Sequence, residues 1–237
     1  METLEQIIHE RHSLRMPFDS EKPVAKRDLK QILEAGSWAP TAHNMQNFAV
    51  VVVDDKALLA SLGAIKRPIS EAFIRENYPL LSFSEEELAR KKVGIMGTNF
   101  PPSWRNPDAR PPESIGKEEF ASPFPACATL LVVLYDPAWR APASEGDFLG
   151  IISLGCVMEN MWLMANSLGI GFHIISALSA ERVENEVKQL LNIPDKLKIA
   201  FSARLGYPIT PPPNYVRVRR DVDDFVHYNG FGCRGFD

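Results

Sequence analysis

The sequence predicts an α+β fold in which a central mixed β-sheet is flanked by helices. Two kinds of segment support this fold class. Apolar, β-branched runs at residues 48–53 and 129–135 have the length and composition of covered strands. Other segments repeat apolar residues at helical spacing, and residues 148–168 are apolar almost all round, which is typical of a buried helix. We expect residues 1–237 to form a single domain.

The chain is expected to begin with two helices. Residues 4–11 repeat apolar side chains at helical spacing and predict a short amphipathic helix. A second helix begins near Val24, and Gly36 and then Pro40 are signals that stop it.

A loop, a strand and a third helix should follow. Residues 39–46 form the loop, and the continuous apolar run at 48–53 predicts a strand covered on both faces. Asp55 is then placed to cap a short helix that contains residues 58–62.

The regular pattern weakens between residues 69 and 126. Helical potential remains at 71–75 and 84–96, but prolines interrupt most of the rest. A loop this long in a compact protein is usually disordered or functional. Because the stretch also contains aromatic residues, we interpret about 77–123 as a lid or an excursion that wraps a partner subunit.

The second half of the chain starts with the strand at 129–135 and the long apolar helix. One subunit rarely surrounds such a helix and still places a sheet beside it, so a second copy of the chain is the expected cover. The remaining pattern predicts a strand at 170–175, a helix at 180–191 capped by Ser179, and a strand at 196–205.

Composition limits the possible functions. With 45% hydrophobic and 24% charged residues, the chain is neither disordered nor collagen-like. A net charge of -4 and a pI near 5.8 provide no global attraction to nucleic acid or to an anionic membrane. Any anion site must therefore be a local cluster of basic residues, which suits a small phosphorylated ligand better than a polymer.

A cytoplasmic protein is expected. The three cysteines show no CxxC spacing and suggest a reducing compartment. The N-terminus lacks the apolar run of a signal peptide, and the most apolar run, 148–158, stops at Glu159-Asn160 and is too short to span a bilayer.

Two basic segments are candidates for such an anion site. If residues 11–15 are extended, then Arg11, Ser13 and Arg15 point to one side, where two guanidiniums and a hydroxyl suit a phosphate monoester. The same alternation at residues 216–220 brings Arg217 and Arg219 to one side. The alternative interpretation of the first segment is a helix end whose basic residues favour the dipole.

The order of these features resembles the FMN-dependent nitroreductase family. The resemblance rests on Arg-His-Ser-Leu-Arg at 11–15, Ala-Pro-Thr-Ala-His-Asn-Met-Gln at 39–46, the long apolar helix, Leu-Gly-Ile-Gly at 168–171, Leu-Gly-Tyr-Pro at 205–208 and the C-terminal arginines. It covers both ends and residues 148–208, but not the proline-rich stretch.

The resemblance implies a nitroreductase-like fold, an intertwined homodimer and two FMN sites at its interface. It assigns the N-terminal segment to the FMN phosphate, the ribityl chain and one edge of the ring, and the C-terminal arginines to the phosphate. It assigns the loop at 40–44 to the partner's flavin, and a backbone N–H after the 170–175 strand to flavin N5. The implied FMN-binding residues are Arg11, His12, Ser13, Arg15, Pro40, Thr41, Ala42, Asn44, Ile174, Ile175, Ser176, Ala177, Arg217 and Arg219.

Two departures from the family pattern affect the ring site. The usual Gln-Pro-Trp is Gln46-Asn47-Phe48 here, which restores a backbone N–H and shrinks the aromatic side chain. Ser176 and Ala177 replace a frequent acidic-Gly pair. Because the N5 contact comes from backbone, FMN binding is expected to survive, while substrate preference can change.

The implied activity is a ping-pong transfer of electrons from NADH or NADPH, through FMN, to nitroaromatic, quinone or similar acceptors. His43 is the nearest candidate proton donor, although a loop histidine is more often a surface or packing residue. Two alternatives stay open. One is a specialised flavin enzyme of the same fold, which dehalogenates reductively or cleaves flavin, and the other is a non-catalytic flavin-binding or redox-sensing protein.

Two further motifs match known binding patterns without the context that those patterns need. Gly230 to Gly235 matches a dinucleotide-binding fingerprint, but only two residues follow it, so no helix can present its N-terminus to a pyrophosphate. His9 and His12 have helical spacing without a third ligand, so no metal is expected.

Overall fold

The structure is a computed structural model, and it describes residues 3–65, 75–99, 127–142, 144, 146, 148–211 and 216–234. The chain forms two compact units, each described by itself below. Unit 1 comprises Met1–Arg67 and Gly116–Pro212, and unit 2 comprises Pro68–Ile115 and Pro213–Asp237.

Unit 1 contains a four-stranded sheet in the order β1-β4-β6-β5. Its strands are β1 (Ala49–Val53), β4 (Thr129–Tyr135), β6 (Lys198–Gly206) and β5 (Gly171–Ile175), and every neighbouring pair is antiparallel. The prediction of a mixed sheet is therefore wrong for these described strands. An apolar run predicts that a strand forms. Its direction depends on which end of the sheet the chain reaches after leaving the previous strand, and the run itself does not determine this.

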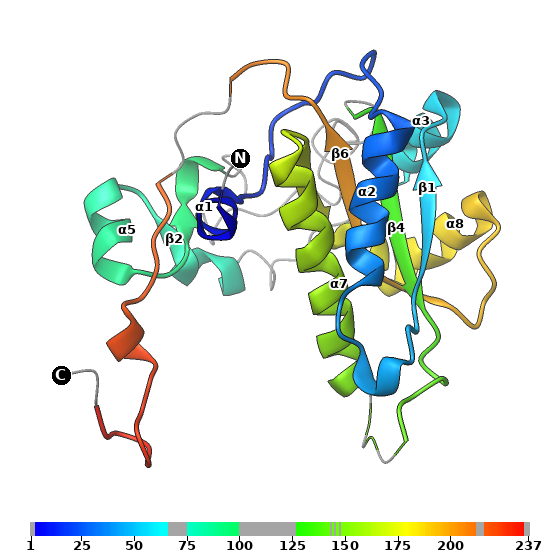
Figure 1. Ribbon diagram of the computed structural model, residues 1–237. Helices are drawn as coiled ribbons and strands as arrows, with labels where there is room; N and C mark the ends of the chain where they lie inside the picture. Colours follow the sequence, from blue (N-terminus) through cyan, green and yellow to red (C-terminus); the bar gives the residue numbers. More distant parts are fainter. Residues whose placement is uncertain are drawn as a thin grey trace. The chain divides into compact units, whose positions relative to one another are not determined.

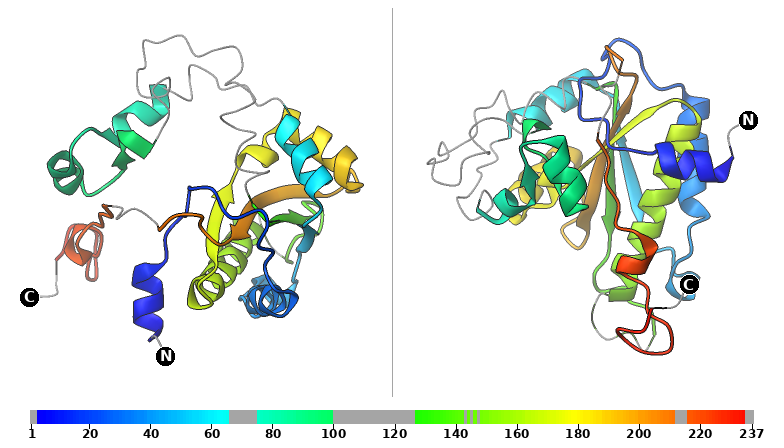
Figure 2. Two further views of the ribbon diagram at one scale, coloured as in Figure 1. Left: turned by 90° about the horizontal axis from the view of Figure 1, so that it is seen from above. Right: turned by 90° about the vertical axis from the view of Figure 1, so that its left-hand side faces the viewer.

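Helices cover both faces of this sheet (Figures 1 and 2). Successive side chains of β4 point to opposite faces. Leu130 and Val132 join a core with α3 (Lys56–Ala64) and α8 (Glu181–Leu191). Leu131 and Val133 join a second core with α2 (Lys26–Ser37) and α7 (Phe148–Ser167). A strand covered on both faces is apolar at successive positions rather than at alternate ones, and the sequence of β4 has this pattern.

Most predicted elements of unit 1 are confirmed. Helix α1 (Leu4–Glu10) begins with a capping box formed by Thr3 and Gln6, and Asp55 caps α3 by accepting a hydrogen bond from the Leu58 N–H at 2.8 Å. The predicted cap of α8 is wrong. Ala180 is its N-cap residue, because the Ser179 hydroxyl donates instead to the Ser176 carbonyl at 2.7 Å.

Gly36 does not stop α2, which continues to Ser37. The glycine is buried against α7, and a Cβ atom at this position would lie only 2.8 Å from Cγ of Met161. Gly36 therefore allows two helices to approach closely, which the sequence pattern could not distinguish from a helix end.

Helix α7 continues beyond Glu159 and Asn160, because both polar side chains have partners in unit 1. Asn160 donates to the Ala35 carbonyl at 3.0 Å, and Glu159 pairs with Arg11. The helix predicted at 148–168 is therefore confirmed. The inference that its apolar run is too short to span a bilayer is wrong, because the 20-residue helix has the length and composition to cross a membrane, as core helices of soluble proteins also can.

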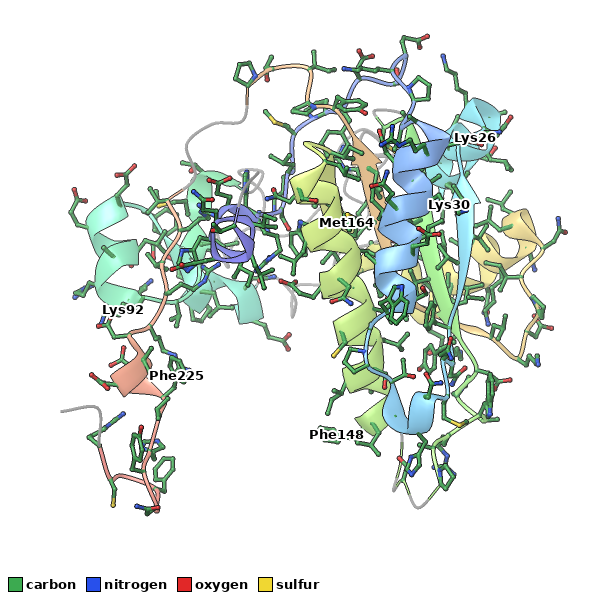
Figure 3. All side chains as sticks on the ribbon, viewed as in Figure 1. Lys26, Lys30, Lys92, Phe148, Met164 and Phe225 are labelled. Carbon is green, nitrogen blue, oxygen red and sulfur yellow. The ribbon has the colours of Figure 1, made fainter. Side chains whose placement is uncertain are left out.

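Helix α7 was expected to be buried on most faces, but only one side of it is buried among the described residues. Residues such as Val157 and Met161 are buried, whereas Phe148 (labelled in Figure 3), Ile151 and Ile152 are 48–68% exposed. Unit 1 alone therefore leaves an apolar face of this helix uncovered among the described residues.

Unit 2 is small. A parallel pair joins β2 (Leu81–Ser82) to β3 (Ile95–Met96), with α5 (Glu85–Lys91) between them. The predicted helical potential at 84–96 is realised only to Lys91, because Lys92 adopts a left-handed conformation with φ 53°. The remaining described elements are the 3₁₀ turns Tyr78–Leu80, Gly97–Asn99 and Val222–Asp224 and the helical residues 75–77. Of the helix predicted at 71–75 the structure describes only Arg75, which is helical, and residues 100–123 of the predicted 77–123 excursion lie outside the described residues.

Candidate flavin site

The N-terminal basic segment lies along an edge of the sheet in unit 1. Arg11 ends α1, and the chain then runs beside the edge strand β5, where the Leu14 N–H donates to the Phe172 carbonyl at 3.1 Å. In an antiparallel strand, alternate residues direct their backbone groups to opposite sides. Ile174, two residues after Phe172, therefore presents its N–H on the same open edge as Leu14.

A buried arginine holds this segment in place. Arg204 on β6 is 1% exposed, and its Nη2 donates to the carbonyls of Met16 at 2.6 Å and Leu14 at 3.3 Å. Its guanidinium carbon also lies 4.6 Å from the centre of the Phe18 ring. Because an unsatisfied buried carbonyl costs about 1–3 kcal/mol, these bonds fix the backbone on both sides of Arg15.

His173 on β5 completes the anchor. Arg204 Nε donates to His173 Nδ1 at 2.9 Å, so the network places the ring proton on Nε2. Burial, followed by the positive charges of Arg204 and Arg15, lowers the pKa of His173 to about 3. The imidazole therefore stays neutral at physiological pH and acts as an acceptor for the arginine.

Two glycines make room for the segment. Gly171 and Gly206 are paired across β5 and β6. A Cβ on Gly171 would lie 2.7 Å from Phe18 Cε1 and 2.9 Å from Leu14 Cδ1, and a Cβ on Gly206 would lie 2.8 Å from Phe18 Cβ. The sheet can accept Leu14 and Phe18 against it only because both paired positions lack a side chain.

Arg11 turns toward α7. Its Nε lies 3.0 Å from Glu159 Oε1, in an ion pair rather than an aligned hydrogen bond, and its guanidinium carbon lies 4.4 Å from the centre of the Trp162 ring. The His12 ring Nδ1 lies 2.7 Å from the Glu10 carbonyl. Ser13 is half-buried and Arg15 is exposed. The structure thus brings the four predicted residues into one segment, and their shared orientation toward a phosphate stays a prediction.

The predicted flavin-packing loop is a strained turn. His43, Asn44 and Gln46 all have φ between 47° and 51°, a region that residues other than glycine rarely adopt. Thr41 Oγ1 accepts from the Gln46 N–H at 3.1 Å, and the Ala42 N–H donates to Ser153 Oγ at 3.1 Å. Such strain persists only where surrounding contacts determine it, and it is common at ligand sites.

At the end of β5 the backbone groups alternate between the open edge, which Ile174 faces, and β6, which Ile175 faces. Ile175 accepts a hydrogen bond from Ser202 Oγ at 2.6 Å, and Ser176 leads into a 3₁₀ turn, Ala177–Ser179. Residues 174–177 therefore adjoin the same strand edge as the Arg11–Arg15 segment. These two groups of predicted site residues are brought together within unit 1.

The C-terminal arginines lie in unit 2. Residues 216–220 belong to no helix or strand and are mostly exposed, and Arg219 Nη1 donates to the Val218 carbonyl at 2.7 Å. Lys92 forms ion pairs with Asp221 and Asp224 just after the arginines. The hydrogen bond from Lys92 to Asp221 raises the pKa of the lysine, and a backbone hydrogen bond from Asp221 lowers the pKa of Asp224. The two-part phosphate clamp stays a prediction.

Sequence analysis missed Arg204, His173 and the role of Asn47. A charged residue inside an apolar strand was the available signal for Arg204. Asn47 donates through Nδ2 to the carbonyls of Asp136 and Trp139, both at 2.8 Å, and accepts from the Asp136 N–H at 3.0 Å. The departure from the family's proline therefore introduces an amide that closes the turn after β4.

The donor set of unit 1 fits a flavin mononucleotide. Two guanidiniums and a hydroxyl on one short segment are suited to a phosphate, with the Arg11 guanidinium paired to Glu159 in this structure, and the adjoining strand edge offers a backbone N–H from Ile174. The described residues contain no group of three or more histidine, cysteine or acidic side chains that could hold a metal.

Comparisons with known proteins identify oxidoreductases that are similar to this chain. An Archaeoglobus fulgidus protein named as an NADH dehydrogenase/NAD(P)H nitroreductase is 22% identical over 227 residues, which cover 96% of this chain and 98% of that protein. An NADPH-dependent oxidoreductase of Staphylococcus aureus is 21% identical over 225 residues, which cover 95% of this chain and 72% of that protein.

A Desulfovibrio desulfuricans structure, named as a nitroreductase in complex with FMN, matches with a TM-score of 0.62 and 17% identity over 98% of this chain and 99% of that chain. The sequence model of the nitroreductase family matches residues 8–207. The protein is therefore an oxidoreductase that belongs to the nitroreductase family.

Proposed function

We propose that the protein is an FMN-dependent oxidoreductase that passes electrons from NADH or NADPH to nitroaromatic, quinone or similar acceptors. The observation that supports this most is the anchored Arg11–Arg15 segment beside the open edge of β5. When bound, FMN supplies hydride acceptance from the nicotinamide and electron delivery to a second substrate that occupies the same site in turn.

The residues of the chain then bind and orient the cofactor. Arg11, Ser13 and Arg15 would hold the phosphate, and a backbone N–H of residues 174–177 would donate to the ring. The family resemblance also assigns Arg217 and Arg219 to the phosphate. Neutral donors at the ring and cations at the phosphate match the charge of each end of FMN.

We also propose that the protein acts as a homodimer. The support is the exposed apolar face of α7, which includes Phe148, Ile151 and Ile152. A large apolar patch on a soluble protein commonly marks an interface. In the dimer, the loop of Pro40, Thr41, Ala42 and Asn44 packs against the partner's flavin, so each site needs both subunits.

Anaerobic titration tests the proposed activity. Purified protein should be yellow, release FMN on denaturation, and bleach when NADH or NADPH is added, with colour restored by a nitroaromatic or a quinone. Yellow protein that neither nicotinamide bleaches would favour a flavin-binding or redox-sensing protein. Protein that cannot take up FMN would refute the proposal.

Variants then test the assignment of the phosphate site. Arg11→Ala removes charge-assisted bonds to the phosphate, so FMN should be retained at least about tenfold more weakly. Arg27→Ala removes an exposed arginine on α2 and is the matched control. Wild-type FMN affinity in the Arg11 variant would show that this residue does not hold the phosphate.

A further inference from the structure

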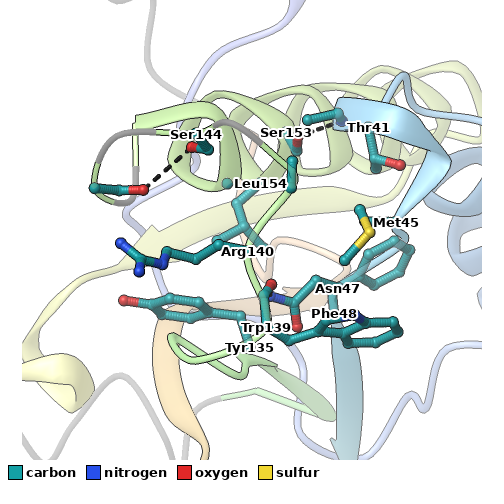
Figure 4. A pocket seen from close by; sticks show the side chains of 14 residues that line it. Thr41, Met45, Asn47, Phe48, Tyr135, Trp139, Arg140, Ser144, Ser153 and Leu154 are labelled. Atoms are coloured by element: carbon teal, nitrogen blue, oxygen red, sulfur yellow. Dashed lines mark hydrogen bonds between the residues drawn. The ribbon is translucent and has the colours of Figure 1, made fainter.

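A small pocket in unit 1 adjoins the predicted flavin-packing loop. It lies between that loop, the turn after β4 and the first turns of α7, and Figure 4 shows Arg140, Trp139 and Tyr135 along one side and Thr41, Met45 and Phe48 along another. Its volume of about 30 Å³ is a few times the roughly 10–15 Å³ that a single water requires on the same measure. The pocket can therefore take the end group of a ligand rather than an entire aromatic ring.

Asn47 gives this pocket a fixed wall. Its three side-chain hydrogen bonds to Asp136 and Trp139 hold the turn from which Trp139 and Arg140 project. A proline in this position has no side-chain amide and could make none of them. The residue that departs from the family pattern thus determines the shape of the pocket.

The lining combines aromatic rings with one cation. Phe48, Tyr135 and Trp139 provide flat apolar surfaces, and the exposed Arg140 guanidinium makes no hydrogen bond or ion pair within the described residues. No carboxylate belongs to the lining among these residues, and Glu145 and Asp147 lie outside them. A guanidinium with free donors beside aromatic rings is suited to an anionic group attached to a planar ring.

The pocket also adjoins the loop that is proposed to pack on the partner's flavin. Thr41 and Ala42 line the pocket and belong to the loop expected to pack on flavin. A ligand whose end group occupies the pocket would therefore extend along this loop, toward the place where an acceptor must be reduced.

Resting on the proposed function, we infer that this pocket binds the anionic end of a planar aromatic acceptor. In this arrangement Arg140 pairs with a carboxylate or similar group of the acceptor and selects anionic over neutral substrates. Asn47 is a positioning residue, because it acts through the turn that carries Arg140.

The first test measures binding without any turnover. Sodium benzoate, which FMN does not reduce, is titrated into FMN-free protein while tryptophan fluorescence is recorded, with benzamide as the neutral counterpart. Benzoate should quench the fluorescence and bind about tenfold more tightly than benzamide, because it gains a charge-assisted bond. Trp139→Phe should remove the signal and so locate it.

Arg140→Gln should weaken benzoate binding by about tenfold and leave benzamide binding unchanged within twofold. Arg27→Gln, which removes the same charge from exposed α2, should leave both unchanged, and Arg140→Lys should restore part of the preference. Equal binding of benzoate by wild-type protein and Arg140→Gln would overturn the inference.

The second test uses the FMN-loaded protein. The ratio of kcat/KM for 4-nitrobenzoate to that for 4-nitrobenzamide should fall about tenfold in Arg140→Gln. Asn47→Ala should raise KM for the anionic substrate more than it lowers kcat, without releasing FMN. Failure to bind FMN or to bleach would refute the proposed function alone, because the benzoate titration still reports on the pocket. An unchanged ratio in Arg140→Gln would refute the assigned specificity.

Discussion

The two basic segments predicted to hold one phosphate are anchored in opposite ways. The N-terminal segment is fixed from the protein interior, by Arg204 and His173 beneath it. The C-terminal segment is fixed at the surface, by the ion pairs that Lys92 (labelled in Figure 3) forms with Asp221 and Asp224. The first anchor consists of buried hydrogen bonds and the second of solvated charges.

This difference predicts different rigidity. Buried hydrogen bonds are strengthened by the low local dielectric, and breaking one leaves an unsatisfied group. Exposed ion pairs are weakened by water and by salt. The Arg11–Arg15 segment is therefore expected to be preorganised for a ligand, while the segment with Arg217 and Arg219 can adjust as the ligand binds.

The largest expected effect follows from Arg204→Met. The variant keeps the length and apolar stem of the side chain but leaves the carbonyls of Leu14 and Met16 without their donor. Removing a buried charge is favourable in itself, but two unsatisfied carbonyls outweigh it, so the free energy of unfolding should fall by about 3 kcal/mol. Urea denaturation measures this loss.

The same variant should retain FMN more weakly, because the backbone around Arg15 is released. Arg204→Lys is the matched control, since it keeps the charge and restores one donor, and its FMN affinity should be intermediate. If Arg204→Met had normal stability and normal FMN affinity, the buried anchor would not be what holds the segment.

The second effect concerns pH. Acid should lower the contribution of the buried anchor to the free energy of unfolding. An ordinary histidine has a pKa near 6.5, whereas burial and the charges of Arg204 and Arg15 lower the pKa of His173 to about 3. Between these values the unfolded chain binds a proton that the folded chain does not bind. The contribution of His173 is therefore complete above pH 6.5 and is lost as the pH falls, by up to about 1.4 kcal/mol per pH unit.

Replacing His173 by Gln keeps an acceptor for Arg204 and removes the titration. Urea unfolding at pH 7, 6 and 5 should show a flatter pH dependence in this variant than in the wild type. His9→Gln, on the exposed surface of α1, should keep the wild-type slope. Equal slopes in all three proteins would contradict a neutral, buried His173.

Sequence patterns predicted the elements that position the site more completely than the contacts that hold it. Composition alone predicted strand β4. Both faces of this strand are covered, so its residues from 129 to 135 are buried or nearly buried and almost all apolar. The N-terminal and C-terminal arginines were singled out as candidate phosphate ligands because basic residues cluster in these two short segments. Strand direction, in contrast, depends on how distant connections return, and no local run carries that information.

The anchor could not be predicted for the same reason. Arg204 is 188 residues from Met16 in the sequence, and their contact depends on the register of β5 and β6. Gly171 and Gly206 appear as ordinary strand ends in the sequence, and only their pairing shows that together they make room for Phe18. Asn47 was recognised as a departure, but its partners lie beyond a stretch whose pattern is weak.

These glycines give a third, intermediate effect. Gly171→Ala places a methyl group against Phe18 and the backbone carbonyl of Gly206, neither of which can move freely, so stability should fall by about 1–3 kcal/mol. Gly36→Ala is the comparison, because its new Cβ meets mainly the flexible side chain of Met161. Urea denaturation should therefore show the larger loss in Gly171→Ala, and the reverse order would mean that the segment is not tightly packed there.

The smallest effect is expected from the surface anchor. Lys92→Asn removes both ion pairs while tolerating the left-handed backbone at φ 53°. FMN should be retained only a few-fold more weakly at low salt, and the difference should vanish near 1 M salt, where the Debye length is about 3 Å. Arg90→Gln, which removes a charge from the exposed face of α5, is the matched control.

The FMN defect of Arg204→Met should persist at the same salt concentration, because salt screens buried bonds weakly. A salt-independent loss in Lys92→Asn, as large as that in Arg204→Met, would show that both segments are rigidly held and that the contrast between them is wrong.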